Sequence, residues 1–343
     1  MTLGGKLPTI QDVARRAQVS TATVSRALSS PELVSEQTRK KVTEAVRATG
    51  YAMNQAARQL RSKAAHTIVV AFPNIGNAYY SVVLDGVVSE TSERGYGALV
   101  ANRLGENPTQ WLTDYFLSNR ADGMVLFDGS LDVSQFYDRK TQRRFPLVVA
   151  CDELPDPRLN SVMIDNRAAG AGATQHLIDL GHRSLGHVYT PSKTAGIESD
   201  RYLGFQDALL RTGIQLRSDW VFTGNFTIES GEAAARAFLA LTDRPTAMFL
   251  ANDEMAMGFM TVLRHAGVRC PEDVSIIGFD DATDSRCMVP ALTTVRQPRM
   301  EIGRKAAGLL IDLLEGEGWP EKPVQITLDY EIIVRESTAP PTR

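Results

Sequence analysis

The pattern of apolar and polar residues changes once along the chain, close to His66. Before this point, apolar residues recur at helical spacing in three short segments, 10–17, 21–28 and 36–49. Beyond it, short β-rich runs alternate with helical segments. Strands are predicted at Thr67–Phe72, Ala98–Ala101, Met124–Phe127, Leu147–Ala150, Val162–Ile164, Leu185–Tyr189, Thr246–Leu250 and Val274–Phe279. Helices are predicted at Tyr80–Arg94, Arg167–Leu180, Arg201–Thr212, Ser230–Leu241 and Glu254–Ala266. This order predicts an α/β fold: an all-α head followed by doubly wound parallel sheets with helices on both faces.

Each helix of the head has its own start signal. Thr9 with Asp12 three positions later resembles a capping box, while Ser20 and Ser35 are N-cap residues for the second and third helices. Gly50 ends the third helix as a left-handed residue. Because only Gln18 and Val19 separate the first helix from the Ser20 cap of the second, the chain must turn tightly between them, which indicates a helix-turn-helix.

The second helix distinguishes a DNA-binding head from any other small three-helix bundle. Its hydroxyl-bearing side chains, Thr21, Thr23 and Ser25, surround Arg26 and are thin enough to enter a major groove. Residues 1–65 also carry eleven Lys and Arg against four Asp and Glu, although the whole chain has a net charge of −3. A basic head on an acidic body favours a polyanionic partner for the head.

The head resembles that of the lac/gal repressor family along the run "TIQDVARRAQVSTATVSRALSSPELVSEQTRKKVTEAVRATGY". The following "NQAARQLRS" is similar to the hinge helix of that family, which inserts a leucine into the minor groove. Two residues depart from the family pattern: Gln18 replaces a glycine in the turn, and Met53 replaces a proline before the hinge. The resemblance implies DNA contacts from Thr9, Ser20, Thr21, Ala22, Thr23, Ser25, Arg26, Asn54, Ala57, Arg58 and Leu60. Leu60 has the alternative of being an ordinary linker residue.

Residues 66–338 exceed the length of one ordinary doubly wound sheet, so two lobes with a cleft between them are expected. Runs such as "RADGMVLF", "DRYLGFQDAL" and "PEDVSIIGFDDA" resemble the family's sensor, which is similar to periplasmic binding proteins. The resemblance implies a DNA-binding domain at 1–53 and a hinge at 54–65. It also implies lobe one at about 66–165 and 293–325, and lobe two at about 166–290 and 326–338.

Ligand-binding residues are expected where strands end and helices begin. The junctions and the resemblance together indicate Asn74, Tyr79, Tyr80, Asp152, Arg201, Phe226, Asn252, Asp253 and Asp280. By resemblance, the two tyrosines stack on a ring and Arg201 with Asp280 clamps hydroxyl or carboxylate groups. The alternatives are a capping role for Asp280, lobe packing for the tyrosines and a surface position for Arg201.

The effector is expected to be a small polar molecule, and a nucleoside is favoured over a sugar. The tyrosine pair and the segments "GNFTIESG" and "EIIVRESTAPP" resemble the cytidine and purine repressor branch of the family. Flat bases stack on aromatic rings, and ribose hydroxyls suit an arginine–aspartate clamp. A sugar remains the alternative, since pyranose faces also stack on aromatic rings.

Other classes of protein fit the sequence less well. The catalytic motifs GxSxG, HExxH and GxxxxGK[ST] are absent, and the histidines have no metal-ligand spacing, so an enzyme, a metal site and a cofactor are not expected. A solute-binding protein would lack the head, and a DNA-bending protein would lack the sensor.

With no signal peptide, no apolar run long enough for a membrane span and sparse cysteines (Cys151, Cys270 and Cys287), a cytoplasmic protein is expected. A homodimer on pseudo-palindromic operator DNA is expected, because heads of this kind bind as symmetric pairs and the resemblance implies dimerisation through the sensor. No leucine heptads follow Glu336, so an additional tetramerising helix is not expected.

Overall fold

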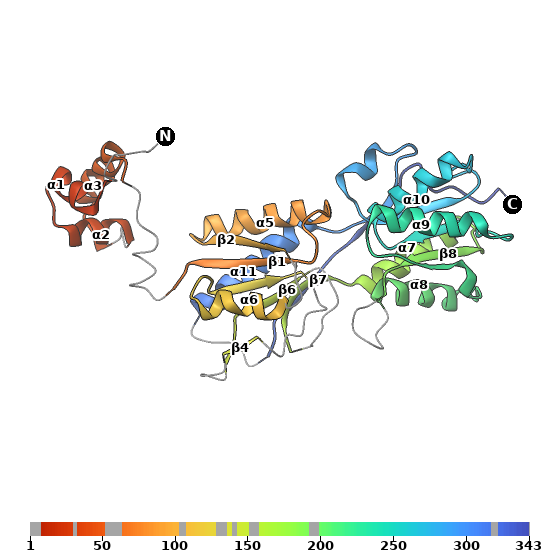
Figure 1. The fold of residues 1–343 in the computed structure, drawn as a ribbon, viewed down its shortest axis with the longest axis horizontal. Coiled ribbons are helices and arrows are strands. Elements are labelled where there is room, and N and C mark those ends of the chain that lie inside the picture. The colour runs from red at the N-terminus through yellow and green to blue at the C-terminus, as the bar shows by residue number, and fades with distance from the viewer. Residues whose placement is uncertain are drawn as a thin grey trace. The chain divides into compact units, whose positions relative to one another are not determined.

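The computed structural model describes residues 8–29, 33–51, 64–102, 108–127, 136–138, 143–150, 158–191, 199–316 and 322–342. The chain divides into two compact units, 1–65 and 66–343, which we call the head and the sensor. The head contains α1 (Ile10–Ala17), α2 (Thr21–Ser29) and α3 (Glu36–Thr49), as Figure 1 shows. Their bounds confirm the three predicted helices.

The head is held together by its caps and a small apolar core. The Asp12 carboxylate accepts hydrogen bonds from the Thr9 backbone N–H at 2.9 Å and from the Thr9 hydroxyl at 2.7 Å. The Thr23 N–H donates to Ser20 Oγ at 3.0 Å. Gln18 ends α1 in the left-handed region, with φ 55° and ψ 43°. A β-carbon is disfavoured in that region, which explains why glycine is usual at this turn.

Twelve of the described sensor strands form two six-stranded sheets, and β4 and β5 pair separately. The sheet of lobe one has the order β13-β7-β6-β3-β1-β2, and the sheet of lobe two has the order β14-β12-β11-β10-β8-β9. Every pairing in them is parallel except that between β12 and β14. The first sheet contains β1 (Thr67–Phe72), β2 (Gly97–Asn102), β3 (Gly123–Leu126), β6 (Leu147–Ala150), β7 (Asn160–Ile164) and β13 (Gln325–Leu328). The second contains β8 (Leu185–Tyr189), β9 (Val221–Thr223), β10 (Ala247–Leu250), β11 (Ser275–Asp280), β12 (Thr293–Arg296) and β14 (Glu331–Ile333).

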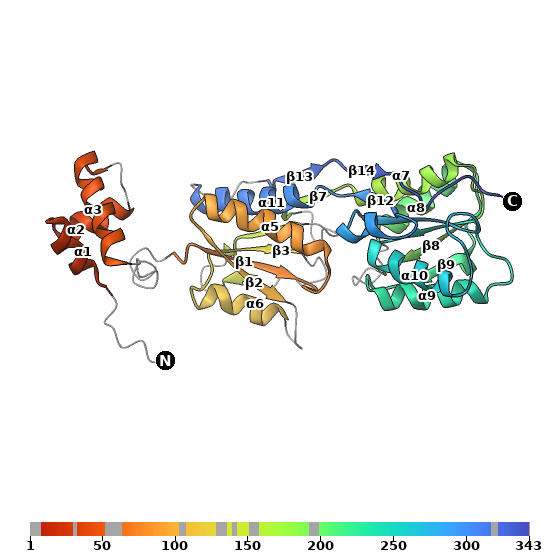
Figure 2. The same ribbon diagram turned by 90° about the horizontal axis from the view of Figure 1, so that it is seen from above.

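Helices cover both faces of each sheet, which confirms the predicted α/β class. Alternate residues of β1 face opposite sides, so Val70 packs with α5 and α11 while Val69 packs with α6. In lobe two, α7 and α8 cover one face and α9 and α10 the other (Figure 2). The helices are α5 (Tyr79–Glu93), α6 (Pro108–Leu117), α7 (Asn166–Asp179), α8 (Asp200–Arg211), α9 (Ile228–Ala240), α10 (Asp253–His265) and α11 (Arg299–Glu315). The short elements are β4 (Tyr137–Asp138), β5 (Arg143–Arg144), η3 (Ser218–Trp220) and η4 (Thr283–Cys287).

The chain crosses between the lobes three times, and two crossings differ from the predicted boundaries. β12 pairs with β11 and so belongs to lobe two, although residues from 293 onward were assigned to lobe one. β13 pairs with β7 and belongs to lobe one, although residues from 326 onward were assigned to lobe two. The crossings therefore lie at 165, 297–298 and 329–330. Pro298 marks the second one, because proline has no N–H with which to continue the ladder.

α5 and α11 approach each other closely through two glycines. A β-carbon on Gly86 would lie 2.2 Å from the Met300 carbonyl oxygen, and one on Gly303 would lie 2.1 Å from the Val83 carbonyl oxygen. Only glycine at both positions permits this contact. The pair fixes α11, and with it the crossing at 297–298, against lobe one.

Candidate DNA-binding surface and effector site

The face of α2 that was predicted to enter the major groove is exposed. Thr21, Ala22 and Arg26 lie at the surface, while Val24 and Ala27 are buried against the other two helices. Arg26 therefore extends away from the head core, where a guanidinium can reach a guanine edge. Ser20 is exposed, and Thr9, Thr23 and Ser25 are half-buried.

Several predicted contact residues lie outside the described residues. They are the hinge residues Asn54, Ala57, Arg58 and Leu60, and the cleft residue Asp152. Their assignments stay predictions.

Arg201 lies at the carboxyl edge of the second sheet, where it joins three elements of lobe two. At the start of α8, its Nε donates to Asn166 Oδ1 at 3.0 Å, and one terminal nitrogen donates to the Ala251 carbonyl oxygen at 2.5 Å. Its guanidinium carbon lies 3.7 Å from the Phe279 ring centroid. The side chain is 14% exposed, which excludes the alternative of a free surface arginine.

Asp280 faces Arg201 from the end of β11. The nearest Asp280 oxygen lies 3.8 Å from an Arg201 terminal nitrogen and accepts a hydrogen bond from Gln297 Nε2 at 2.7 Å. Burial raises the pKa of Asp280 to about 6, although Arg201, Gln297 and Arg299 all favour its ionised form. Its φ of 114° is a strained conformation for any residue with a β-carbon. Strain and desolvation at one residue are typical of a functional position.

Gln297 connects the pair of Arg201 and Asp280 to lobe one. The sequence did not predict this residue. It is 3% exposed and lies at the second crossing. While its Nε2 donates to Asp280, its Oε1 accepts a hydrogen bond from the Tyr79 hydroxyl at 3.1 Å. Tyr79 is itself buried at the start of α5, so one polar chain runs from lobe one through the crossing to lobe two. The sequence signal that could have identified Gln297 is its position as a polar residue directly after β12.

Tyr80 lies half-buried in an aromatic cluster of lobe one. Its ring centroid is 4.9 Å from that of Phe72, 5.2 Å from that of Tyr79 and 6.0 Å from that of Phe127. The two tyrosines therefore differ in their contacts: the Tyr79 hydroxyl donates to Gln297, and the Tyr80 ring packs within the aromatic cluster. Their stacking on an effector ring stays a prediction.

Phe226 and Asn252 complete the lobe-two side of the site. The Phe226 ring centroid lies 5.9 Å from the Arg201 guanidinium carbon, and its backbone has a φ of 67°. The Asn252 Nδ2 donates to the Phe226 carbonyl oxygen at 3.1 Å, while its Oδ1 accepts from the Met255 N–H at 3.0 Å. Asn252 thus caps α10 and holds the Phe226 loop in place.

Two further predicted residues, Asn74 and Asp253, make hydrogen bonds within the fold, and their ligand contacts stay predictions. Asn74 is exposed, and its Oδ1 accepts from the Gly76 N–H at 2.9 Å, which forms a turn. Asp253 is 2% exposed, and its two oxygens accept from the Thr294 hydroxyl at 2.6 Å and from the Ala282 N–H at 2.7 Å. Burial and the neighbouring Asp280 raise the pKa of Asp253 well above its usual range. These contacts tie the start of α10 to β12 and to the segment after β11.

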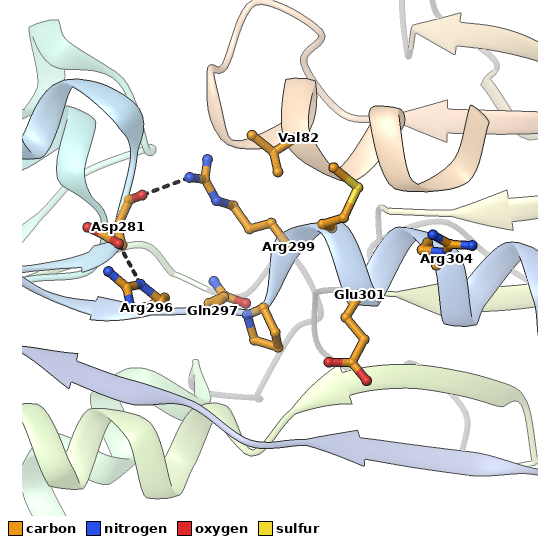
Figure 3. A pocket seen from close by; sticks show the side chains of 9 residues that line it. Val82, Asp281, Arg296, Gln297, Arg299, Glu301 and Arg304 are labelled. Atoms are coloured by element: carbon orange, nitrogen blue, oxygen red, sulfur yellow. Dashed lines mark hydrogen bonds and ion pairs between the residues drawn. The ribbon is translucent and has the colours of Figure 1, made fainter. Parts of the chain in front are cut away.

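A pocket of about 370 Å³ lies beside the second crossing, next to the clamp (Figure 3). Asp281 accepts hydrogen bonds from three arginines in this region. Its carboxylate accepts from Arg296 Nε at 2.7 Å and from Arg335 at 2.5 Å, and its backbone carbonyl oxygen accepts from Arg299 at 2.7 Å. Burial raises the pKa of Asp281, but Arg335 and Arg296 together hold it below its usual range. The pocket is lined by Val82, Asp281, Arg296, Gln297, Pro298, Arg299, Met300, Glu301 and Arg304. It shares only Gln297 with the polar chain.

The arrangement suits recognition of a small polar ring. A buried guanidinium and carboxylate at one strand edge offer a donor and an acceptor to vicinal hydroxyls, and the rings of Phe226 and Phe279 lie near the guanidinium. Among the described residues, no group of three His, Cys, Asp or Glu side chains is placed to hold a metal ion. In the same part of the chain, no helix has both the length and the apolar character of a membrane span.

Comparison with known proteins agrees with this architecture. Residues 9–54 match the model for bacterial regulatory proteins of the lacI family, and residues 174–338 match that for a periplasmic binding protein-like domain. The repressor CytR of Escherichia coli (strain K12) is 35% identical over 334 residues, 96% of each chain. The regulator CelR of Thermobifida fusca is 35% identical over 340 residues, 96% of this chain and 98% of its own.

Solved structures show the same likeness. A complex of CelR with cellobiose has a TM-score of 0.72 and 31% identity, covering 96% of this chain and 99% of its own. The lac repressor dimer bound to operator and the anti-inducer ONPF has a TM-score of 0.82 and 28% identity, covering 97% and 100%. The head and the sensor together define a DNA-binding transcriptional regulator with an effector-binding domain, and not an enzyme. The chain belongs to the lacI family of bacterial regulatory proteins.

Proposed function

We propose that this protein is a cytoplasmic repressor that binds pseudo-palindromic operator DNA as a homodimer. Arg26 and the other exposed residues of α2 would read base edges. The predicted hinge residues, Leu60 above all, would contact the minor groove. Symmetric half-sites require two heads, which supports the dimer. The CytR repressor and the lac repressor dimer–operator complex add support from relatives.

We infer that a nucleoside releases the protein from its operator. The observation that carries this is the buried pair of Arg201 and Asp280 beside the Phe226 ring, since ribose hydroxyls fit the pair and a base fits the ring. The likeness to CytR favours the same class. A sugar is the second candidate, because the CelR structure that resembles this chain is a complex with cellobiose.

A thermal-shift screen of nucleosides, monosaccharides and disaccharides tests the effector class. A ligand at 100 times its dissociation constant adds roughly 2.7 kcal/mol of native-state stability, a readily measured shift. Hits are then titrated into the protein on operator DNA, with fluorescence anisotropy as the readout. Release by a nucleoside that is abolished in Asp280→Ala supports the proposal. Stabilisation and release by sugars alone would replace it with the second candidate.

A further inference from the structure

One hydrogen bond joins the lobes away from the polar chain of Tyr79. Glu254, in the first turn of α10 in lobe two, accepts from the Ala78 backbone N–H at 3.2 Å. Ala78 is the N-cap residue of α5 in lobe one, 176 positions away along the chain. The bond therefore connects the start of a lobe-two helix to the start of a lobe-one helix.

The segment before α5 is already tied by its own side chains. Asn74 Oδ1 accepts from the Gly76 N–H, and Asn77 Oδ1 accepts from the Tyr79 N–H at 2.8 Å. These two bonds restrain the loop where it presents the Ala78 N–H to the other lobe.

The surroundings of Glu254 disfavour its ionised carboxylate, and the bond from Ala78 offsets part of this cost. Burial raises the pKa of Glu254, the Ala78 N–H lowers it, and the charge of Glu229 at the start of α9 raises it further. A helix N-terminus favours a negative charge, so the start of α5 offsets part of this cost only while the lobes are together. Once they separate, Glu254 regains water and Ala78 loses its acceptor.

We propose that Glu254 is a latch whose contact with Ala78 holds the lobes in the arrangement that assembles the effector site. Tyr79 follows Ala78 directly, and its hydroxyl reaches Gln297, which holds Asp280. The latch and the polar chain therefore depend on the same turn of α5. The role of this arrangement in binding the effector rests on the proposed function. The contact between Glu254 and Ala78 is independent of that proposal.

The test compares wild type with Glu254→Ala, Glu254→Gln and the control Glu229→Gln, using the full-length protein without DNA or effector. Amide hydrogen exchange reports the Ala78 N–H directly. Arginine-directed chemical labelling reports lobe separation, because Arg201 is 14% and Arg236 63% exposed in their side chains, so that Arg236 is an internal reference. Glu254→Ala should raise Ala78 exchange and Arg201 labelling about tenfold, the usual effect of losing one charge-assisted hydrogen bond.

Glu254→Gln keeps an acceptor oxygen and should have a smaller effect, and Glu229→Gln should raise neither signal. If Ala78 exchange rises while Arg201 labelling stays constant, the bond is local and the latch is refuted. Equal changes in Glu229→Gln would also refute it, since they would reflect charge alone. Because no effector is used, failure of the nucleoside proposal leaves this result unaffected.

Discussion

Replacing Asp280 by asparagine should abolish the effector response and stabilise the protein. Burial raises the pKa of Asp280 from 3.8 to about 6, so its surroundings disfavour the ionised form by about two pKa units. At roughly 1.4 kcal/mol per unit, this amounts to about 3 kcal/mol at pH 7. Asparagine keeps the size and an acceptor for Gln297 but carries no charge, and we expect a net gain of about 1–3 kcal/mol.

The pH dependence separates this effect from other causes. Because the folded pKa lies above the unfolded one, the stability linked to Asp280 is present below about pH 4 and is lost as pH rises through about 6. The stability difference between Asp280→Asn and wild type should therefore grow between pH 4 and 6 and stay constant above. Thermal denaturation at a series of pH values measures it.

Asp281, the next residue along the chain, provides a matched control, because its replacement should change the stability in the opposite direction. Arg335 and Arg296 hold the pKa of Asp281 below its usual range, so its ionised form is stabilised in the folded protein. Asp281→Asn should therefore destabilise the protein at pH 7. A destabilised Asp280→Asn, or a difference that does not change between pH 4 and 6, would refute the reasoning.

Three further substitutions test the head and the hinge. Arg26→Ala should cost about 1–3 kcal/mol of operator affinity and relax preference at one operator position in a binding-site selection, whereas a uniform loss on all DNA would make Arg26 a phosphate contact. Gln18→Gly should stabilise the head by about 0.5–1 kcal/mol in denaturant unfolding, because φ is 55° there, while Gln11→Gly within α1 should destabilise it. Leu60→Gly should lower specific operator affinity and spare salt-sensitive binding to random DNA. Intact specific affinity and effector response in that variant would make the hinge a simple tether.

Local signals in the sequence predicted most of the fold. The cap residues Thr9, Ser20 and Ser35 determine helix starts through contacts three residues away, so they are readable without tertiary information. The lobe boundaries depend instead on which sheet a strand joins. The four residues of β12 contain no signal that distinguishes the two sheets, and their wrong assignment to lobe one concealed Gln297 at the strand end.

The sequence predicted where the candidate site lies better than it predicted which contacts each side chain makes. Strand ends at the carboxyl edge were expected to carry ligand contacts, and Arg201, Asp280 and Phe226 do lie together there. Asn74 and Asp253 also follow strands, yet the side chain of Asn74 closes a turn and that of Asp253 links α10 to β12. The direction of a side chain at a strand end depends on neighbours distant in sequence, such as Thr294 for Asp253. Sequence spacing alone does not contain that information.

The threefold crossing has a consequence for the order in which the protein folds during synthesis. Lobe one contains β1 at the start of the sensor, but it also needs α11, whose Leu310 and Ile302 cover its sheet, and β13, which pairs with β7. Until residues 299–328 have left the ribosome, the part of that face that α11 covers and the free edge of β7 have no partner. Parallel strands distant in sequence form slowly and leave aggregation-prone edges exposed. Nascent chains that stop before β13 should therefore depend on chaperones, although the DNA-binding head, complete within the first 65 residues, is already made.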